Sequence, residues 1–218
     1  MSQRIRHIRA LAAFALAGAA LLAWPAVAAA QTVSGAASAV QATVFGTSTV
    51  LAGTGPLVDA LDAREASDMA SSILWLGGAD VLHATAISSV DEVASEASLA
   101  DLGVGVAGNY VSAAFVMASA LAPIDGSPAG MSEIDGLAIN GVPVYVTGEP
   151  NQTVWLLGGR VIINEQTPTS TGTTVNALHV IADGIADLVF GSASAGVSSG
   201  GSTTPPPLPP PPPLPGLF

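Results

Sequence analysis

Apolar and polar residues alternate in short runs along most of this chain, and two-residue turn signals separate the runs. Alternation with a period of two, bounded by Gly, Asn or Asp pairs, is typical of β-strands joined as hairpins. The second half shows three such hairpins, 137–147, 154–164 and 173–194, centred on Asn140-Gly141, Gly158-Gly159 and Asp183-Gly184. The series predicts an antiparallel all-β domain, a single β-sandwich or flattened barrel, with a β-solenoid as the alternative.

The hairpin at Asn140-Gly141 is the most specific of these signals. Asn and Gly tolerate positive φ at both central positions of a type I′ turn, whose twist suits a hairpin. Pro143 lacks an amide donor, so its strand is expected at a sheet edge. In 173–182, strict alternation predicts two partly apolar faces, one with Val175, Ala177, His179 and Ile181 and the other with Asn176, Leu178 and Val180.

The first half is less regular. We expect a strand over 41–52, a connection over 53–72 that includes a short helix at 56–69, and two strands over 73–90 joined at Gly77-Gly78. Segment 91–100 fits a helix or a sheet edge, because its alanines and glutamates favour one and its serines the other. Beyond it we expect strand-like sequence over 102–121, broken at Gly108-Asn109, and a loop over 123–130.

The first thirty residues form a targeting segment. A basic start is followed by the apolar run 10–23 and by a small-residue motif, Ala28-x-Ala30, before Gln31. The run is shorter than the roughly 20 residues of a membrane-spanning helix, so cleavage near Ala30 is expected and no integral span remains in the mature chain. The sequence thus predicts export and an extracellular or cell-surface location.

The mature chain divides into three parts by composition. Residues 31–39 are small and polar and predict a loose lead-in, 40–197 form the β domain, and 198–218 form a tail rich first in Gly, Ser and Thr and then in Pro. The proline run 205–215 favours polyproline II, with a length of roughly 34 Å. It reads as a stiff, disordered spacer, and alternatively as a ligand for the aromatic-lined groove of a partner module.

Charge and composition narrow the function classes. After cleavage, two arginines and sixteen acidic residues leave a formal charge of −14, a surface that repels nucleic acid. Cysteine and lysine are absent from the sequence, which excludes disulfides and lysine chemistry. We expect no cofactor and no structural metal, since no spaced Cys/His ligands occur. The abundance of small residues suits closely packed sheets.

Two segments carry the candidate polar residues. Glu165, between Asn164 and Gln166, follows an apolar strand and is expected to pin a loop by accepting amide donors, with ligand contact as the alternative. Asn176 and His179 share a strand, where the histidine is expected to be hydrogen-bonded and either in the core or semi-buried. A hydrolase would need His179, Glu165 and a serine or second carboxylate to converge in one cleft.

Trp75 and Trp155 lie near expected hairpin tips. We expect both rings to be buried, while exposed rings would indicate a module that binds carbohydrate or another small neutral ligand by stacking. Ligand contacts would then fall on Trp75, Trp155, Glu165 and His179.

The strings 156–166, which ends in Asn164-Glu165-Gln166, Val175-Asn-Ala-Leu-His-Val180, and 189–195 resemble the choice-of-anchor P family of bacterial exported proteins. The resemblance spans about 40–197. It implies an ectodomain that different members attach to the surface by different C-terminal devices, with no catalytic residues to transfer. We therefore expect a non-catalytic extracellular or surface protein, with an envelope or extracellular-matrix partner. Small-ligand binding is the alternative, and hydrolysis ranks behind it.

Overall fold

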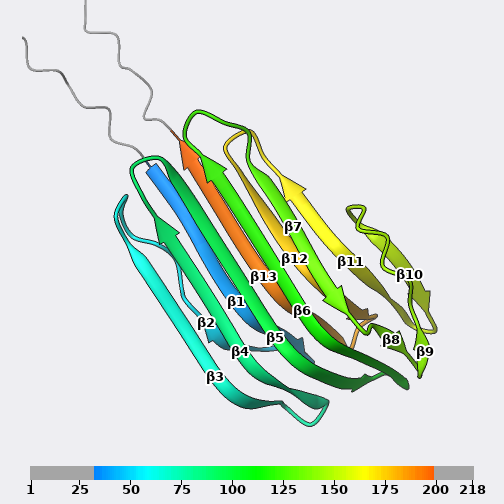
Figure 1. The fold of residues 1–218 in the computed structure, drawn as a ribbon. Coiled ribbons are helices and arrows are strands. Elements are labelled where there is room, and N and C mark those ends of the chain that lie inside the picture. Colours follow the sequence, from blue (N-terminus) through cyan, green and yellow to red (C-terminus); the bar gives the residue numbers. More distant parts are fainter. Residues whose placement is uncertain (1–31, 199–218) are drawn as a thin grey trace, which may run out of the picture. The chain divides into compact units, whose positions relative to one another are not determined.

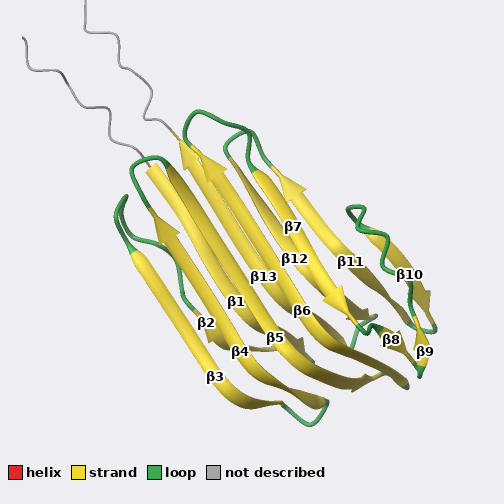
Figure 2. Ribbon diagram, in the orientation of Figure 1, coloured by secondary structure: helices red, strands yellow, loops and turns green. Residues whose placement is uncertain are grey.

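The computed structural model describes residues 32–198, which form thirteen β-strands and, within that range, no helix (Figures 1 and 2). The expected signal peptide (1–30) and the tail beyond Ser198 lie outside the described residues. Sheet A contains β1 (Thr32–Val44), β2 (Thr47–Gly53), β10 (Gln152–Leu156), β11 (Gly159–Pro168), β12 (Gly172–Ala182) and β13 (Ala186–Ser198). Sheet B contains β3 (Ala63–Ile73), β4 (Gly77–Ser88), β5 (Glu92–Val106), β6 (Asn109–Pro123), β7 (Ala129–Asp135), β8 (Ala138–Ile139) and β9 (Val142–Pro143).

The two sheets are antiparallel throughout and form a sandwich, as predicted, without closing into a barrel. Sheet A has the order β10-β11-β12-β13-β1-β2 and sheet B the order β3-β4-β5-β6-β8-β9, with β7 also paired to β6. The first strand pairs with the last, from Thr32 opposite Ser198 to Val44 opposite Ala186. Residues 32–39, expected as a loose lead-in, therefore belong to β1 and are held by this pairing.

Small side chains fill the middle of the sandwich. A separate buried cluster consists of Ala37, Ala84 and Ala97 only. A Cβ placed on Gly191 would lie 3.4 Å from the Ala118 nitrogen and 3.4 Å from the Ala97 oxygen, both in sheet B. The sheets thus approach each other closely at this point, which is the packing that the small-residue composition suggested.

In both sheets the in–out alternation inverts part-way along the strands. In sheet A the inversion occurs at one row of residues that runs across five neighbouring strands and is omitted from the strand pairing: Ala52, Ala39, Gly191, Ala177 and Asn164. Every second residue of this row has positive φ, namely Ala52 (44°), Gly191 (67°) and Asn164 (52°). We call it the inversion row. The register is the same on both sides of the row, so only the facing of the side chains changes. In sheet B the alternation inverts near Val81 (49°) and Asp101 (47°), where the register between β4 and β5 also shifts.

This inversion corrects the prediction for β12. Val175 and Ala177 are buried as one face of an alternating strand, but the next buried residues are Leu178 and Val180. His179 therefore does not share a face with Val175, and it points to the same side as Asn176. Simple alternation assumes extended backbone with negative φ at every residue. The row breaks the alternation in each strand that it crosses, with positive φ in every second strand.

Other differences lie in the first half. Residues 56–69, expected to contain a helix, form a loop and the start of β3. The turn between β3 and β4 is at 74–76 instead of Gly77-Gly78. Segment 91–100 belongs to β5, which lies between β4 and β6 and is neither a helix nor an edge. In this strand exposed Glu92 and half-buried Ala94 flank buried Val93, so the pairing with β4 and β6 outweighed the helix propensity of the segment.

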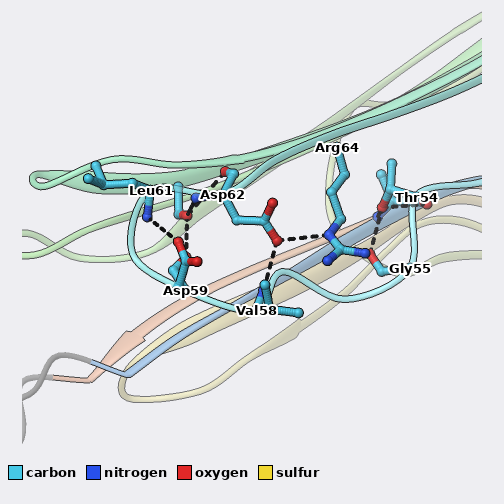
Figure 3. A network of polar contacts seen from close by, with 9 residues as sticks. Thr54, Gly55, Val58, Asp59, Leu61, Asp62 and Arg64 are labelled. Atoms are coloured by element: carbon cyan, nitrogen blue, oxygen red, sulfur yellow. Dashed lines mark hydrogen bonds and ion pairs between the residues drawn. The ribbon is translucent and has the colours of Figure 1, made fainter.

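The loop between β2 and β3 is held by two aspartates (Figure 3). The Asp62 carboxylate accepts hydrogen bonds from Arg64 Nε at 2.8 Å and from the Val58 amide at 2.9 Å. The arginine and this amide hold the pKa of Asp62 below its ordinary value. The Asp59 carboxylate accepts a hydrogen bond from the Leu61 amide at 2.9 Å, and the backbone carbonyl of Asp59 accepts one from the Ser88 hydroxyl at 2.6 Å.

The Asn140-Gly141 turn is confirmed, with φ of 53° and 76°, and Pro143 lies in the edge strand β9. Within residues 32–198 the structure offers no helix long and apolar enough to cross a membrane.

Candidate functional site

The outer face of sheet A, turned away from sheet B, carries the polar residues that the sequence singled out. Beyond the inversion row, β11, β12 and β13 place Glu165, Asn176 and Ser192 side by side, because Glu165 pairs with Asn176 and Asn176 with Ser192. His179 lies on the same face, one outward position nearer the other end of β12. Inversion of the alternation is what brings Asn176 and His179 to one face.

His179 bridges two carboxylates. Its Nδ1 lies 2.8 Å from Glu165 Oε2, and its Nε2 lies 3.0 Å from Asp187 Oδ1. A carboxylate only accepts, so the doubly protonated imidazolium is the form that satisfies both partners at once. The histidine side chain is 13% exposed, and it ties β11, β12 and β13 together across their outer face.

The same network continues through amide and hydroxyl groups. Asn176 Nδ2 donates to Glu165 Oε2 at 2.7 Å, and Asn176 Oδ1 accepts from the Ser192 hydroxyl at 2.8 Å. The chain of contacts thus runs Asp187–His179–Glu165–Asn176–Ser192. Each member satisfies its neighbour, which favours a rigid surface over a set of free reactive groups.

A depression of about 410 Å³ lies beside this network. It exists because glycine and serine occupy outward positions on β1, β2 and β13 where larger side chains would fill the space. Hydroxyl and amide groups provide its polar lining: Ser38, Gln41, Thr174, Asn176, Ser192 and Ser194. Gln41 Nε2 donates to Ser38 Oγ at 2.7 Å, so part of this lining is already paired.

Asn164 and Gln166 point the other way. Asn164 is 3% exposed and its Nδ2 donates to the Gly148 carbonyl at 2.9 Å. Gln166 Nε2 donates to Asn164 Oδ1 at 2.9 Å and to the Gly130 carbonyl of β7 at 3.1 Å. These two amides fasten the edge of sheet A to the loop before β10 and to sheet B. The pinning expected of Glu165 is performed by its neighbours.

Both tryptophans are exposed, so the expectation of buried rings is wrong. Trp155 is 76% exposed on the outer side of edge strand β10, opposite Arg160, in the row that continues through Ile181 to Asp187. Trp75 is 69% exposed and lies in the β3–β4 turn, where its ring stacks on Phe45 with centroids 6.5 Å apart. The structure thus brings Glu165, His179 and Trp155 to one face and leaves Trp75 at the end of the sandwich.

The hydrolase criterion can be applied to this geometry. Glu165, His179 and a second carboxylate, Asp187, do converge. The imidazole, however, fills the space between the two carboxylates, where a glycosidase would need substrate and water. Ser192 donates to Asn176 instead of His179, so the serine and histidine are not arranged as nucleophile and base.

The other histidine of the described residues, His83, is separate from this face. His83, on the outer side of sheet B, lies 3.8 Å from Glu65. Among residues 32–198, no three His, Cys, Asp or Glu side chains are grouped so that they could hold a metal ion.

Asp187 and Ser192 are the members that sequence reasoning did not single out. The expected two-residue turn at Asp183-Gly184 would set Val180 opposite Asp187, whereas the structure has a three-residue turn, 183–185, that sets Ile181 opposite Asp187 and His179 opposite Val189. The observed pairs put Asp187 on the face of His179. Ser192 lies beyond the inversion row, where simple alternation from Asp187 places it on the opposite face.

Comparison of the chain with protein-family models, with curated proteins and with solved structures yields no match.

Proposed function

We propose that this chain is an exported, non-catalytic protein of the extracellular space or cell surface, whose β-sandwich serves as an interaction module. The observation that carries the non-catalytic part is the engagement of His179 on both nitrogens by Glu165 and Asp187. A general base needs a free nitrogen directed at a substrate proton, and this imidazole has both nitrogens facing carboxylates. The leader at residues 1–30 supports export.

The resemblance to the choice-of-anchor P family belongs to the same proposal. Two of its strings meet in space, since Glu165 of the first contacts Asn176 and His179 of the second. An interaction module of this kind would display the outer face of sheet A toward an envelope or extracellular-matrix partner.

The experiment is fractionation of the native host with antibody to residues 31–218, together with intact mass of the recovered protein. A mass that begins at Gln31, found in the medium or on the envelope, supports export. Retention of residues 1–30 on a cytoplasmic protein would refute it. Turnover of any glycoside or ester by the purified protein that disappears in Glu165→Gln would refute the non-catalytic part.

Exposure of Trp155 favours a second candidate function, binding of a neutral carbohydrate. An exposed indole on a sheet face next to Arg160 offers a stacking surface for a sugar ring. Affinity electrophoresis in soluble neutral polysaccharides tests it, with Trp155→Ala as the binding variant and Trp75→Ala as the control. Retardation that both variants keep would exclude Trp155 as the stacking residue.

A further inference from the structure

Six β-turns gather at one end of the sandwich, here called the apex, opposite the end where Thr32 pairs with Ser198 (Figure 1). Contacts between neighbouring turns hold the apex together. The Phe45 amide donates to the Ile185 carbonyl at 2.9 Å, and Asn109 Nδ2 donates to the Leu157 carbonyl at 3.2 Å. The first of these contacts joins two turns of sheet A, and the second joins the sheets.

Three of the apical turns share one backbone conformation but differ in their first residue. The φ pairs are 47° and 80° at Phe45-Gly46, 48° and 78° at Ala107-Gly108, and 53° and 76° at Asn140-Gly141. Asparagine suits the left-handed first position, whereas a bulky aromatic residue is disfavoured there. The turn itself therefore gives no reason for a phenylalanine at position 45.

Phe45 is 70% exposed, so burial does not explain it either. Its ring stacks on Trp75 across the two sheets with an interplanar angle of 17°. The pair leaves aromatic surface open to solvent at the apex. Residues that satisfy neither local conformation nor the core are frequent at functional sites.

A shallow groove of about 370 Å³, largely open to solvent, lies beside Phe45, between the β1–β2 and β12–β13 turns. We call it the apex groove. Its apolar lining includes Phe45, Ile181 and Ile185, and two carboxylates, Asp183 and Asp187, belong to the same lining. A groove with apolar walls and carboxylates matches a side chain that has an aliphatic stem and a cationic head.

The carboxylates of the apex groove favour a cation, although His179 and Arg160 lie on the same face of sheet A. Among the described residues, Asp183 forms no ion pair. Asp187 is 58% exposed although one of its oxygens accepts from His179 Nε2. Arg160 lies two strands from Asp187 in the same row, and it forms no ion pair with a carboxylate of the described residues. The mature chain as a whole, at −14, attracts basic partners from a distance.

We propose that the apex groove binds a lysine or arginine side chain of a basic protein partner. The stem would lie on Ile181 and Ile185, and the charged head would meet Asp183, Asp187 and the face of Phe45. This inference names the partner of the interaction module and so rests on the proposed function. Its site lies at the apex and shares only Asp187 with the network around Glu165.

The test uses residues 31–218 and two fluorescein-labelled peptides, Gly-Leu-Lys-Leu-Gly and the same peptide with acetyl-lysine, in a fluorescence anisotropy titration. Acetylation keeps the stem and removes the charge, so we expect at least tenfold weaker binding. Binding of the lysine peptide should also weaken as salt rises from 0.05 to 0.5 M. Equal binding of the two peptides would overturn the proposal.

Variants locate the site. Asp183→Asn with Asp187→Asn should weaken binding at least tenfold, whereas Glu133→Gln with Asp135→Asn, an equal charge change on β7, should leave it within twofold. Phe45→Gly relieves the positive φ and keeps the fold, and it should weaken binding about fivefold. Equal losses in both double variants would mean non-specific attraction and would overturn the site. Failure here would leave export of the chain unaffected, so the two proposals can fail separately.

In a Trp155→Phe background, Trp75 is the one tryptophan of residues 31–218, and its emission should shift on peptide binding. An unchanged spectrum at saturation would place the peptide elsewhere and overturn the apex assignment. Displacement of the peptide by 1 mM Ca²⁺ at constant ionic strength would show that the carboxylates prefer a metal ion, and it would overturn the assignment to a lysine or arginine side chain.

Discussion

Gly191→Ala tests the close approach of the two sheets at the inversion row. Gly191 has φ of 67°, and a Cβ there would lie 3.3 Å from the Ala177 Cβ and 3.4 Å from backbone atoms of Ala97 and Ala118. Two of these three neighbours are backbone atoms of sheet B, which cannot rotate away as a flexible side chain could. The added methyl group therefore has to push the sheets apart or shift β13.

Gly184 provides a matched control. It has φ of 71°, and a Cβ there would meet nothing within 4 Å. Both alanines experience the same left-handed penalty of about 1–2 kcal/mol, partly offset by the stiffer unfolded chain. Only Gly191→Ala adds overpacking, which costs about 1–3 kcal/mol in a packed interior. The difference between the two variants isolates the packing cost.

The assay is reversible urea unfolding of residues 31–218 and both variants, followed by circular dichroism. We expect the free energy of unfolding of Gly191→Ala to be about 1–3 kcal/mol below that of Gly184→Ala, and its Tm to be roughly 2–12 °C lower. Equal unfolding free energies would refute the reasoning. They would mean that the sheets separate at Gly191 without cost, and that close packing there does not hold the sandwich together.

Three further predictions concern polar contacts. Asn164→Ala should lower the free energy of unfolding by about 2–3 kcal/mol, since it removes two buried hydrogen bonds and the residue type suited to φ of 52°; an effect below 0.5 kcal/mol in urea unfolding would contradict this role. His179→Gln should cost about 1–2 kcal/mol, and a double-mutant cycle with Asp187→Asn should show coupling, because Asp187 loses its donor. Arg64→Gln should lower Tm at neutral pH, and the deficit should shrink as pH falls through the pKa of Asp62 in the folded protein. The reason is that a carboxyl whose pKa is lowered by folding stabilises the fold at pH values above its pKa in the unfolded chain, and this stabilisation disappears when the carboxyl is protonated. A deficit that does not change with pH would show that Arg64 acts without the Asp62 charge.

The fold class and the later hairpins could be predicted because their signals are local. A two-residue turn such as Asn140-Gly141 fixes its hairpin by its own backbone preferences. Asp183-Gly184 also marks a hairpin, although its turn has three residues, 183–185. The prediction failed at 56–69, where helix-favouring residues lie in a loop and in β3. The pairing of Ala63–Ile73 with β4 and the bonds of Asp59 and Asp62 decide that segment, and neither is visible in the propensities of its residues.

Three of the five members of the candidate site were predictable, but their arrangement was not. Glu165, Asn176 and His179 could be singled out as polar residues within apolar strands. That these three residues lie together on one face could not be deduced, because alternation placed Asn176 and His179 on opposite faces of one strand. The left-handed residues that reverse this are Asn164 and Gly191, and they lie on the neighbouring strands.

The inversion row therefore does more than bend the strands. Since Ala177 lies between Asn164 and Gly191 in that row, a change of facing in β12 has to occur together with the same change in β11 and β13, or the core residues of adjacent strands would point to opposite sides. The Glu165–Asn176 and Asn176–Ser192 contacts lie directly beyond the row, and the His179–Asp187 contact lies before it. His179 reaches across the row to Glu165, so this hydrogen bond forms only when all three strands invert together. The polar network thus depends on the same inversion that lets the sheets pack closely at Gly191. A substitution that disturbs the close packing should therefore also disturb the network.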